Sequence, residues 1–357
     1  MTMTMTSKQR FLSAMRYNGY DRPPARYYAT PEVTAAMLKR YGLADELSLR
    51  EKLGCDFRLI DPPYIGPPRR FFPAGMRDGL WGEKYEMISF GHGENREAVF
   101  LPFKDMVDVS EMEGLPDPAP TADWYDYSTI AAQCGRFKDY VCWTGGTTTP
   151  DFINGISRVR GMEQTLLDIA TEDPILIRLL DMFEAFYYEK TRRVLEAAKG
   201  GIDVICVGDD LGTQKGLLIS PAAFDKLFAP RLKRFFDLGH EYGALVMMHC
   251  CGSIYRLIPR LIEMGLDILE VVQVDAADMA IEKLHNEFYK KISFCGSISV
   301  QATLPFGSAA DVRAEVEKRK LLFKDGGMVI APTHQIQVGT PLENIEELYR
   351  AIGSFKD

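Results

Sequence analysis

Short apolar runs alternate with longer amphipathic segments over most of the chain after residue 140. Runs of this kind, apolar on both faces, are typical of buried parallel strands, whereas apolar residues spaced three and four apart indicate helices. The expected strands are Tyr140–Thr144, Asp203–Val207, Ala244–Met248, Ile268–Val272, Ile292–Phe294 and Met328–Ala331. The expected helices are Met162–Ile169, Pro174–Ala198, Pro221–Tyr242, Ser253–Met264 and Ala309–Lys324.

The N-terminal part of the chain adds two strands and two helices to this pattern. The strands are expected at Ala25–Tyr28 and Phe57–Ile60, and the helices at Ser7–Tyr17 and Pro31–Tyr41. Eight strands that alternate with helices predict an α/β protein with a (β/α)8 TIM barrel, and 357 residues suffice for one such domain over 1–357. No Gly-x-Gly-x-x-Gly follows an early strand, which counts against a dinucleotide-binding sheet.

The segment from about 64 to 128 has a different composition. It is rich in Pro, Gly and aromatic residues, carries a turn signal at Asp78-Gly79, and contains a strand-like piece at Tyr85–Phe90. We interpret it as an insertion after the second strand, a small meander that could cover the mouth of an active site.

Composition and charge exclude several classes of function. The chain has 42 basic and 50 acidic residues, a net charge of −8, and its Lys and Arg are dispersed, so no nucleic-acid partner is expected. No apolar run approaches the roughly 20 residues that span a bilayer, and Met1–Lys8 has no apolar core. Seven cysteines, mostly in apolar runs, indicate reduced thiols. We therefore expect a soluble, cytoplasmic protein that does not associate with membranes.

A candidate metal site follows the strand Ala244–Met248. His249 and Cys251 are two residues apart, so in extended backbone their side chains lie on the same face, while Cys250 points into the wall. Zinc favours nitrogen and sulfur ligands of this kind at tetrahedral angles. Taken alone, the pair is more often a packed histidine with two buried free thiols than a metal site.

Further polar residues come where other expected strands end, on the rim where barrel enzymes carry their chemistry. The candidate catalytic residues are Asp209, Asp210, Glu270 and Gln273. Because Asp209 and Asp210 are adjacent, at most one is expected to face the site, where it would orient a metal ligand or bind a cationic substrate group. Glu270 and Gln273 are expected either to contact substrate, to orient a ligand, or to be ordinary solvated rim residues.

Several motifs together resemble the uroporphyrinogen decarboxylase superfamily, and most of all its branch of zinc- and corrinoid-dependent methyltransferases similar to methylcobamide:coenzyme M methyltransferase. The resemblance covers nearly the whole chain. The motifs that carry it are Ser7-Lys8-Gln9-Arg10-Phe11, Asp21-Arg22-Pro23, Asp209-Asp210-Leu211-Gly212, Ile219-Ser220-Pro221, His249-Cys250-Cys251-Gly252, Gly265-Leu266-Asp267 to Gln273, Gly326-Gly327 and Pro341-Leu342-Glu343-Asn344.

The resemblance implies a (β/α)8 barrel with a zinc ion bound by a His-x-Cys pair and a distant cysteine. His249 and Cys251 match the pair, but His334 stands where the distant cysteine is expected. An imidazole in place of a thiolate leaves the site with one negative charge fewer and makes the metal a stronger Lewis acid. Cys295 is the alternative third ligand.

The activity implied is a methyl transfer between a small methylated compound or thiol and a corrinoid such as methylcobalamin. The sequence has no Asp-x-His-x-x-Gly element, so the corrinoid is expected on a separate corrinoid protein. The direction of transfer stays open, and the resemblance allows a homodimer.

Two other functions stay open. One is a metal-independent decarboxylase, but the arginine-rich Met-Arg-Gln-Ala-Gly-Arg element of that branch is here Ala25-Arg26-Tyr27-Tyr28-Ala29-Thr30, with a single arginine. Many substrate carboxylates would then lose their charge partners, unless Arg69-Arg70 compensates. The other is a binding barrel without catalysis.

Overall fold

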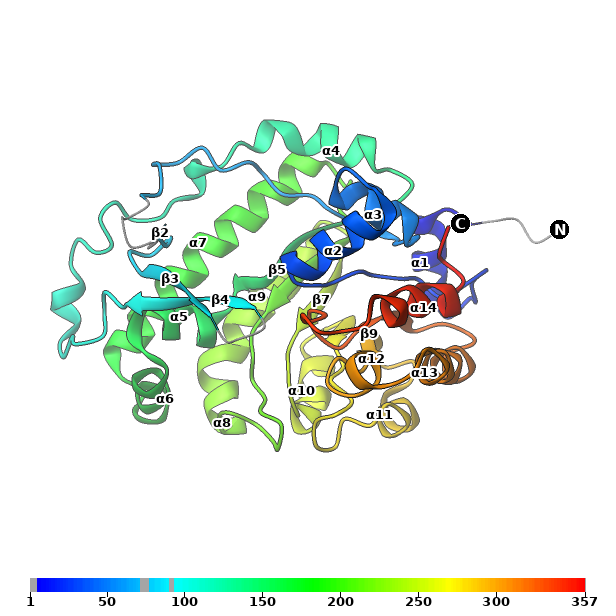
Figure 1. Cartoon of the computed structure of the whole chain (residues 1–357). Helices are drawn as coiled ribbons and strands as arrows, with labels where there is room; N and C mark the ends of the chain where they lie inside the picture. Colours follow the sequence, from blue (N-terminus) through cyan, green and yellow to red (C-terminus); the bar gives the residue numbers. More distant parts are fainter. Residues whose placement is uncertain (1–4, 71–76, 90–92, 357) are drawn as a thin grey trace.

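A computed structural model describes residues 5–70, 77–89 and 93–356. A sheet of seven parallel strands curls around the centre, and helices cover its outer face (Figure 1). The strand order β1-β5-β6-β7-β8-β9-β10 follows the chain, which confirms the barrel-like α/β fold expected from the alternating pattern. These strands are β1 Phe57–Leu59, β5 Val141–Pro150, β6 Val204–Gly208, β7 Leu245–His249, β8 Ile268–Val271, β9 Ser293–Ile298 and β10 Met328–Pro332.

The segment expected as the first strand, Ala25–Tyr28, forms no regular strand. Ala25 makes an isolated parallel bridge to Ile330 of β10, whose N–H donates to the carbonyl of Pro24 at 2.9 Å. On the other side, the N–H of Asp56 donates to the carbonyl of Ala25 at 2.9 Å, just before β1. Because Pro24 has no N–H, this segment cannot extend a full ladder. It nevertheless takes the eighth position, between the two edges of the sheet.

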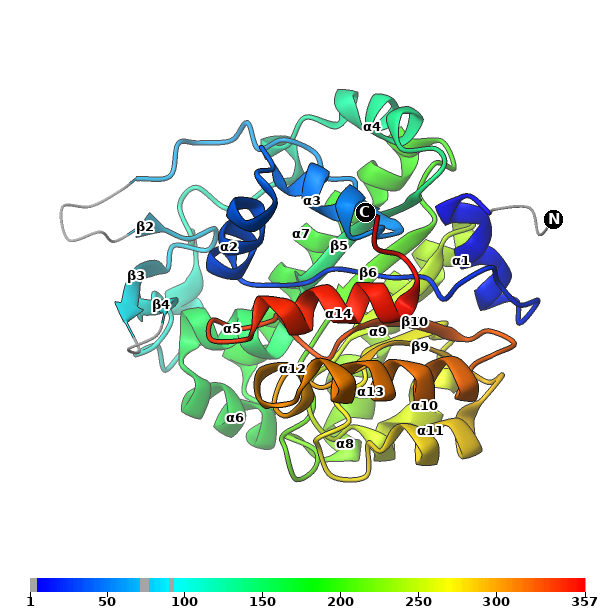
Figure 2. The ribbon, with the colours of Figure 1, turned by 45° about the vertical axis from the view of Figure 1, so that its right-hand side comes forward.

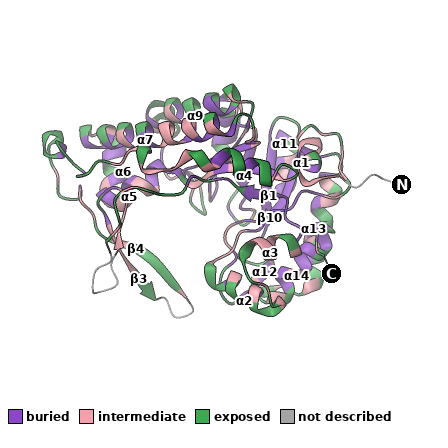
Figure 3. Cartoon of the chain, turned by 90° about the horizontal axis from the view of Figure 1, so that it is seen from above, coloured by how far each residue is buried: buried purple, intermediate pink, exposed green. Residues whose placement is uncertain are grey.

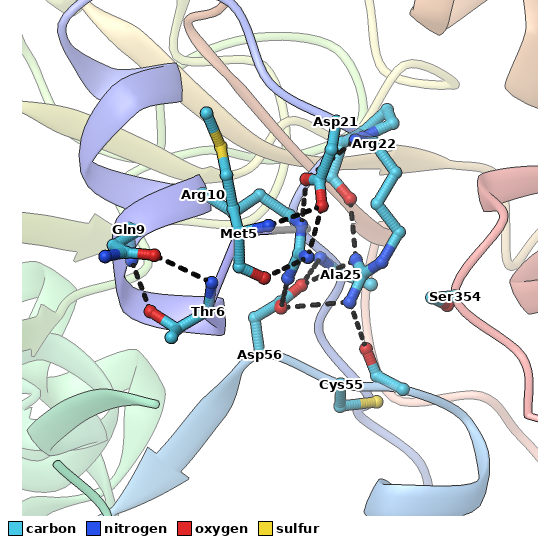
Figure 4. A network of polar contacts seen from close by, with 12 residues as sticks. Met5, Thr6, Gln9, Arg10, Asp21, Arg22, Ala25, Cys55, Asp56 and Ser354 are labelled. Carbon is cyan, nitrogen blue, oxygen red and sulfur yellow. Dashed lines mark hydrogen bonds and ion pairs between the residues drawn. The ribbon is translucent and has the colours of Figure 1, made fainter. Parts of the chain in front are cut away.

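A buried polar network fixes this closure at the N-terminal ends of the strands (Figure 4). The carboxylate of Asp56 is fully buried and accepts hydrogen bonds from Arg10 at 2.7 Å, from Arg22 at 2.8 Å and from the N–H of Ala25 at 2.7 Å. Asp21 accepts a further bond from Arg10 at 2.6 Å. Helix α1 (Ser7–Met15), the turn after it and the start of β1 are therefore tied together by charge.

The strands bury side chains on both faces, which explains their continuous apolar runs. Val204 and Cys206 of β6 face the barrel interior, whereas Ile205 and Val207 pack against the surrounding helices. Phe11 of α1 also lies in the interior cluster and meets the ring of Phe57 edge-on at 5.2 Å. The interior cluster consists of Phe11, Phe57, Val141, Val204, Cys206, Met247, Ile268, Cys295, Val329 and Ala331.

The outer helices include all those expected from the sequence, and the last helix packs beside the first ones (Figure 2). Arg40 of α2 pairs with Glu343 of α14 at 2.7 Å. Among the described helices, none has both the length and the apolar composition required to cross a membrane. The helices are α1 Ser7–Met15, α2 Pro31–Tyr41, α3 Glu46–Lys52, α4 Ile130–Arg136, α5 Phe152–Arg160, α6 Met162–Thr171, α7 Pro174–Ala198, α8 Pro221–Ala223, α9 Ala229–Glu241, α10 Ile258–Glu263, α11 Ile281–Phe288, α12 Thr303–Phe306, α13 Ala309–Leu322 and α14 Leu342–Ile352.

Two expected helices are modified by proline. The expected helix Pro221–Tyr242 contains a π-helical turn, Phe224–Phe228, between α8 and α9, because Pro230 cannot donate the N–H of a regular turn. The expected helix Ser253–Met264 begins instead as a 3₁₀ turn, Tyr255–Leu257, before α10, which has Pro259 in its first turn.

The segment interpreted as an insertion contains a three-stranded antiparallel sheet, β2-β3-β4, separate from the barrel sheet. Its strands are β2 Arg77–Asp78, β3 Lys84–Ser89 and β4 Glu94–Phe100, and β3 corresponds to the expected strand Tyr85–Phe90, of which Phe90 lies outside the described residues. Three 3₁₀ turns follow at Val109–Met112, Ala122–Trp124 and Tyr127–Thr129. Seen from above, β3 and β4 stand out from the body with many exposed residues (Figure 3).

Candidate metal centre

Strand β7 carries the first two metal-competent side chains to the C-terminal rim of the barrel. His249 is its last residue and is 3% exposed, and Cys251 follows after one residue. The Sγ of Cys251 lies 3.4 Å from the Nε2 of His249, so the two side chains converge. Cys250 points away, is buried, and its Sγ accepts a hydrogen bond from the N–H of Leu211 at 3.2 Å. The alternation of side chains expected from the sequence is confirmed.

His334 completes a group of three donors. It lies just after β10, and one ligand atom from each of His249, Cys251 and His334 lies within 4.8 Å of the other two. The ring centroids of the two histidines are 6.1 Å apart. Two imidazole nitrogens and one sulfur at this spacing fit the donor set of a zinc site that keeps a fourth position for a reactant.

The electrostatics of the three donors favour metal binding over protonation at the imidazoles. Burial lowers the pKa of His249 to about 4 against the opposing effect of Asp210. Burial also lowers the pKa of His334. Burial, followed by the nearby carboxylate of Asp210, raises the pKa of the Cys251 thiol. At neutral pH both imidazoles therefore offer lone pairs, while the thiol must lose a proton when a metal binds.

Asp210 is the aspartate that lies at the site. Its Oδ1 accepts the N–H of Cys251 at 2.9 Å and lies 3.9 Å from the Nε2 of His249, and its Oδ2 accepts from the side chain of Asn154 at 2.8 Å. Burial would raise the pKa of Asp210, but His249 and these hydrogen bonds outweigh it and lower that pKa. Asp209 instead accepts the N–H of Ile153 in the first turn of α5 at 2.9 Å. Asp209 thus orients α5 and does not face the donors.

Glu270 and Gln273 approach the donors from the neighbouring strand. Glu270, on β8, places its Oε2 3.5 Å from the Nδ1 of His249 and forms a buried ion pair with Arg26. Gln273 accepts the N–H of Gly252 at 2.8 Å. The first approach, although no described residue forms a hydrogen bond at the Nδ1, places a carboxylate on that side of the imidazole and leaves the Nε2 toward Cys251. The second contact fixes the loop that follows the cysteine.

Cys295, the alternative third ligand, lies elsewhere. It is fully buried on β9, in the cluster that fills the barrel interior, and burial raises the pKa of its thiol to about 11. The group of donors within 4.8 Å of one another includes His334 and does not include Cys295.

Two residues at the site were not identified from the sequence. Arg26 lies beside Glu270 and over the ring of Trp143, with its Cζ 4.5 Å from the ring centroid. A single arginine inside an apolar segment is a signal for a buried ion pair, but the partner could not be named. Asn154, which binds Asp210, carries no such signal.

A hollow of about 370 Å³ opens directly at the donors. Beyond Asp210, Cys251 and His334, its wall is mostly uncharged and rich in glutamine, and a small molecule fits its volume. The lining residues are Asp210, Cys251, Gln273, Val300, Gln301, His334, Gln335 and Gln337.

Comparisons with known proteins found one family model and several solved structures that are similar to this chain. Residues 103–355 match the family model described as "Uroporphyrinogen decarboxylase (URO-D)". A solved methyltransferase from Methanosarcina mazei is similar over 98% of this chain and 99% of its own, with 19% identity and a TM-score of 0.66. A B12-independent methionine synthase from Shewanella sp. W3-18-1, solved with selenomethionine, covers 93% of this chain and 94% of its own, with 12% identity and a TM-score of 0.48. No curated protein matches the chain.

Proposed function

The chain belongs to the uroporphyrinogen decarboxylase family, and we propose that it is a zinc-dependent methyltransferase. It would move a methyl group between a small methylated compound or thiol and a corrinoid carried by a separate protein. The observation that carries the proposal is the convergence of His249, Cys251 and His334 at the mouth of the barrel.

The donor set supports zinc for a chemical reason. Two neutral imidazoles and one thiolate satisfy three positions of a tetrahedral ion and leave a net positive centre. Bound zinc would act as a Lewis acid on the heteroatom that carries, or receives, the methyl group. The hollow of about 370 Å³ beside Cys251 and His334 gives that heteroatom a place to bind.

The remaining rim residues have positioning roles in this proposal. Glu270 holds the Nδ1 side of His249, so that the Nε2 side stays available as a ligand. Asp210 holds the backbone of Cys251 and faces the hollow, where it can accept a proton or attract a cationic donor. Gln273 keeps the Gly252 turn in place.

The structural neighbour from Methanosarcina supports the same function, since it is named a methyltransferase and matches nearly all of both chains. Its 19% identity establishes a shared fold, and the activity is extended to this chain as part of the proposal. A decarboxylase of the same family is less compatible with the site, because Arg26, the arginine of the N-terminal element, is engaged by Glu270.

Metal content and methyl transfer test the proposal together. We expect about one zinc per wild-type chain by mass spectrometry, and loss of that zinc in Cys251→Ala and in His334→Ala. Cys295→Ala, which removes a buried thiol from the barrel interior, should retain it. Methyl exchange between added cobalamin and a small methylated thiol or ether should require the zinc.

Wild-type protein that neither carries nor takes up zinc contradicts the proposal. So does zinc-independent decarboxylation of a carboxylated pyrrole that survives chelation, since this is the outcome expected of the alternative enzyme.

A further inference from the structure

A second hollow, of about 420 Å³, lies between the small antiparallel sheet and the barrel. Its walls come from β3 and β4, from the C-terminal end of β5, and from helices α5 and α7. Its size is that of a small-molecule site. None of the three zinc donors lines it.

The wall of this hollow is unusually basic for a chain of net charge −8. Four cationic side chains line it, against the two carboxylates of Asp78 and Glu83. Glu83 already accepts the N–H of Trp81 at 2.8 Å and the hydroxyl of Tyr85 at 2.9 Å. Asp78 pairs with Arg70 at 3.1 Å. The four cations are Arg69, Arg96, Arg158 and Lys190.

Two of these cations, Arg69 and Arg96, make no ion pair with any carboxylate among the described residues. Each lies over an aromatic ring instead, with Arg69 5.0 Å from the centroid of Tyr64 and Arg96 4.7 Å from that of Tyr85. Stacking fixes the plane of a guanidinium and leaves its N–H groups free at the edge. The two arginines are thus prepared to bind a planar or tetrahedral oxyanion.

The other two cations are anchored deeper in the fold. Arg158 on α5 pairs with Asp151 at 2.9 Å, and Lys190 on α7 pairs with Asp61 at 3.1 Å. An arginine has five N–H donors and a lysine has three, so each retains donors beyond its ion pair.

Helix α5 links the wall of this hollow to the residues that hold the zinc donors, although the two hollows share no lining residue among the described ones. Asn154 on this helix binds Asp210, which in turn holds Cys251. Arg158 is four residues further along α5 than Asn154. Residues at this spacing lie on the same face of a helix, with their Cβ atoms about 6 Å apart. The same helix therefore carries a cation of the basic hollow and a residue that positions the zinc donors.

We infer that this hollow binds the oxyanion end, a carboxylate or a phosphate, of the methylated compound. The identity of the ligand as that compound rests on the proposed function, whereas oxyanion binding rests on the hollow alone. The residues that recognise the charge come from the insertion, α5 and α7, and not from the N-terminal element around Arg26.

Isothermal titration of the zinc-loaded full chain with benzoate, benzamide and inorganic phosphate tests the inference. Benzoate or phosphate should bind saturably, and benzamide, a neutral analogue of benzoate, should not. Arg69→Gln and Arg96→Gln should each weaken oxyanion binding at least about tenfold, because each removes a charge-assisted hydrogen bond. The matched control is Arg136→Gln, an exposed arginine of α4 that also stacks, 5.0 Å from the centroid of Phe137, but lies outside the hollow.

Preference for benzoate over phosphate, or the reverse, would support the inference and identify the acidic group. Equal binding of benzoate and benzamide, or equal weakening by the control variant, would overturn it. Zinc content measured on the same samples separates the two proposals. Protein that takes up no zinc but still binds benzoate contradicts only the methyltransferase. Zinc-loaded protein that binds neither anion contradicts only the oxyanion site.

Discussion

The buried ion pair between Arg26 and Glu270 connects the stability of the barrel to the metal centre. The side chains are 6% and 3% exposed, and Arg26 is held further by the ring of Trp143 at 4.5 Å. The perturbation we propose is a double-mutant cycle with Glu270→Gln, Arg26→Met and the two together. Because Glu270 also lies 3.5 Å from the Nδ1 of His249, the same variants report on the zinc ligand.

The expected magnitude follows from burial. Removing one partner leaves the other charge buried without compensation, which costs about 3–5 kcal/mol in the free energy of unfolding. Removing both charges avoids this penalty, so the double variant should be less destabilised than the sum of the single variants by about 2 kcal/mol or more. Urea unfolding of the metal-free protein measures the free energy of unfolding of each variant, and so the coupling between the two charges. Glu270→Gln should also weaken zinc binding by about 10–100-fold in competition with a chelator.

A matched control is available in the ion pair of Arg160 and Asp168, which is 2.8 Å long with side chains 3% and 2% exposed. Asp168→Asn should lower the free energy of unfolding by a similar amount and leave the affinity for zinc unchanged. If Glu270→Gln costs less than about 1 kcal/mol, or if Asp168→Asn weakens zinc binding equally, the reasoning is refuted.

Three further predictions concern titration and closure of the barrel. Because burial lowers the pKa of His249 to about 4, the folded metal-free protein binds fewer protons than the unfolded chain between about pH 4 and 6.5. The free energy of unfolding should therefore fall by about 3 kcal/mol as the pH drops through that window. In His249→Gln, denaturant titrations at several pH values should show a smaller change of this free energy with pH. Zinc binding near neutral pH should release about one proton, from Cys251, in a pH-stat measurement; zinc uptake without proton release would contradict its role as a thiol donor. Asp56→Asn should lower the free energy of unfolding by about 3 kcal/mol, since Arg10 and Arg22 lose a fully buried partner, while the folded protein keeps its zinc stoichiometry.

The fold could be predicted from the sequence because the parallel strands bury both faces and the long helices bury one. The runs before Asp209 and before His249 have this character, and both are strands. The eighth strand was overestimated, because the residues around Ala25 are apolar enough for a strand while Pro24 prevents a regular ladder. The short helices α5 and α11 were missed although each has an apolar face, since eight or nine residues make only about two turns and such a segment is easily taken for a loop.

The site was predictable where local geometry decides it. Strand alternation alone separates His249 and Cys251 from Cys250, and the structure shows this arrangement. The choice between Asp209 and Asp210 depends on the start of α5, and the ion pair of Glu270 depends on a residue over two hundred positions earlier. Such long-range pairings are set by tertiary packing and leave no trace in residue spacing.

The N-terminal motifs that contribute to the family resemblance have a structural role here. Arg10 and Arg22 bind Asp56 (Figure 4). Because Asp56 comes just before β1, whereas the metal donors come at or after the ends of β7 and β10, this network lies at the opposite end of the barrel. Their presence therefore indicates the way the barrel closes, and the evidence for chemistry comes from the C-terminal half of the chain.

The central claim is that His249, Cys251 and His334 together bind zinc, and X-ray absorption spectroscopy at the zinc edge tests it most directly. We expect one sulfur neighbour at about 2.3 Å and two imidazole nitrogens at about 2.0–2.1 Å, with the sulfur lost in Cys251→Ala. Two sulfur neighbours, which would require another cysteine such as Cys295 at the metal, or a shell without sulfur, would contradict it.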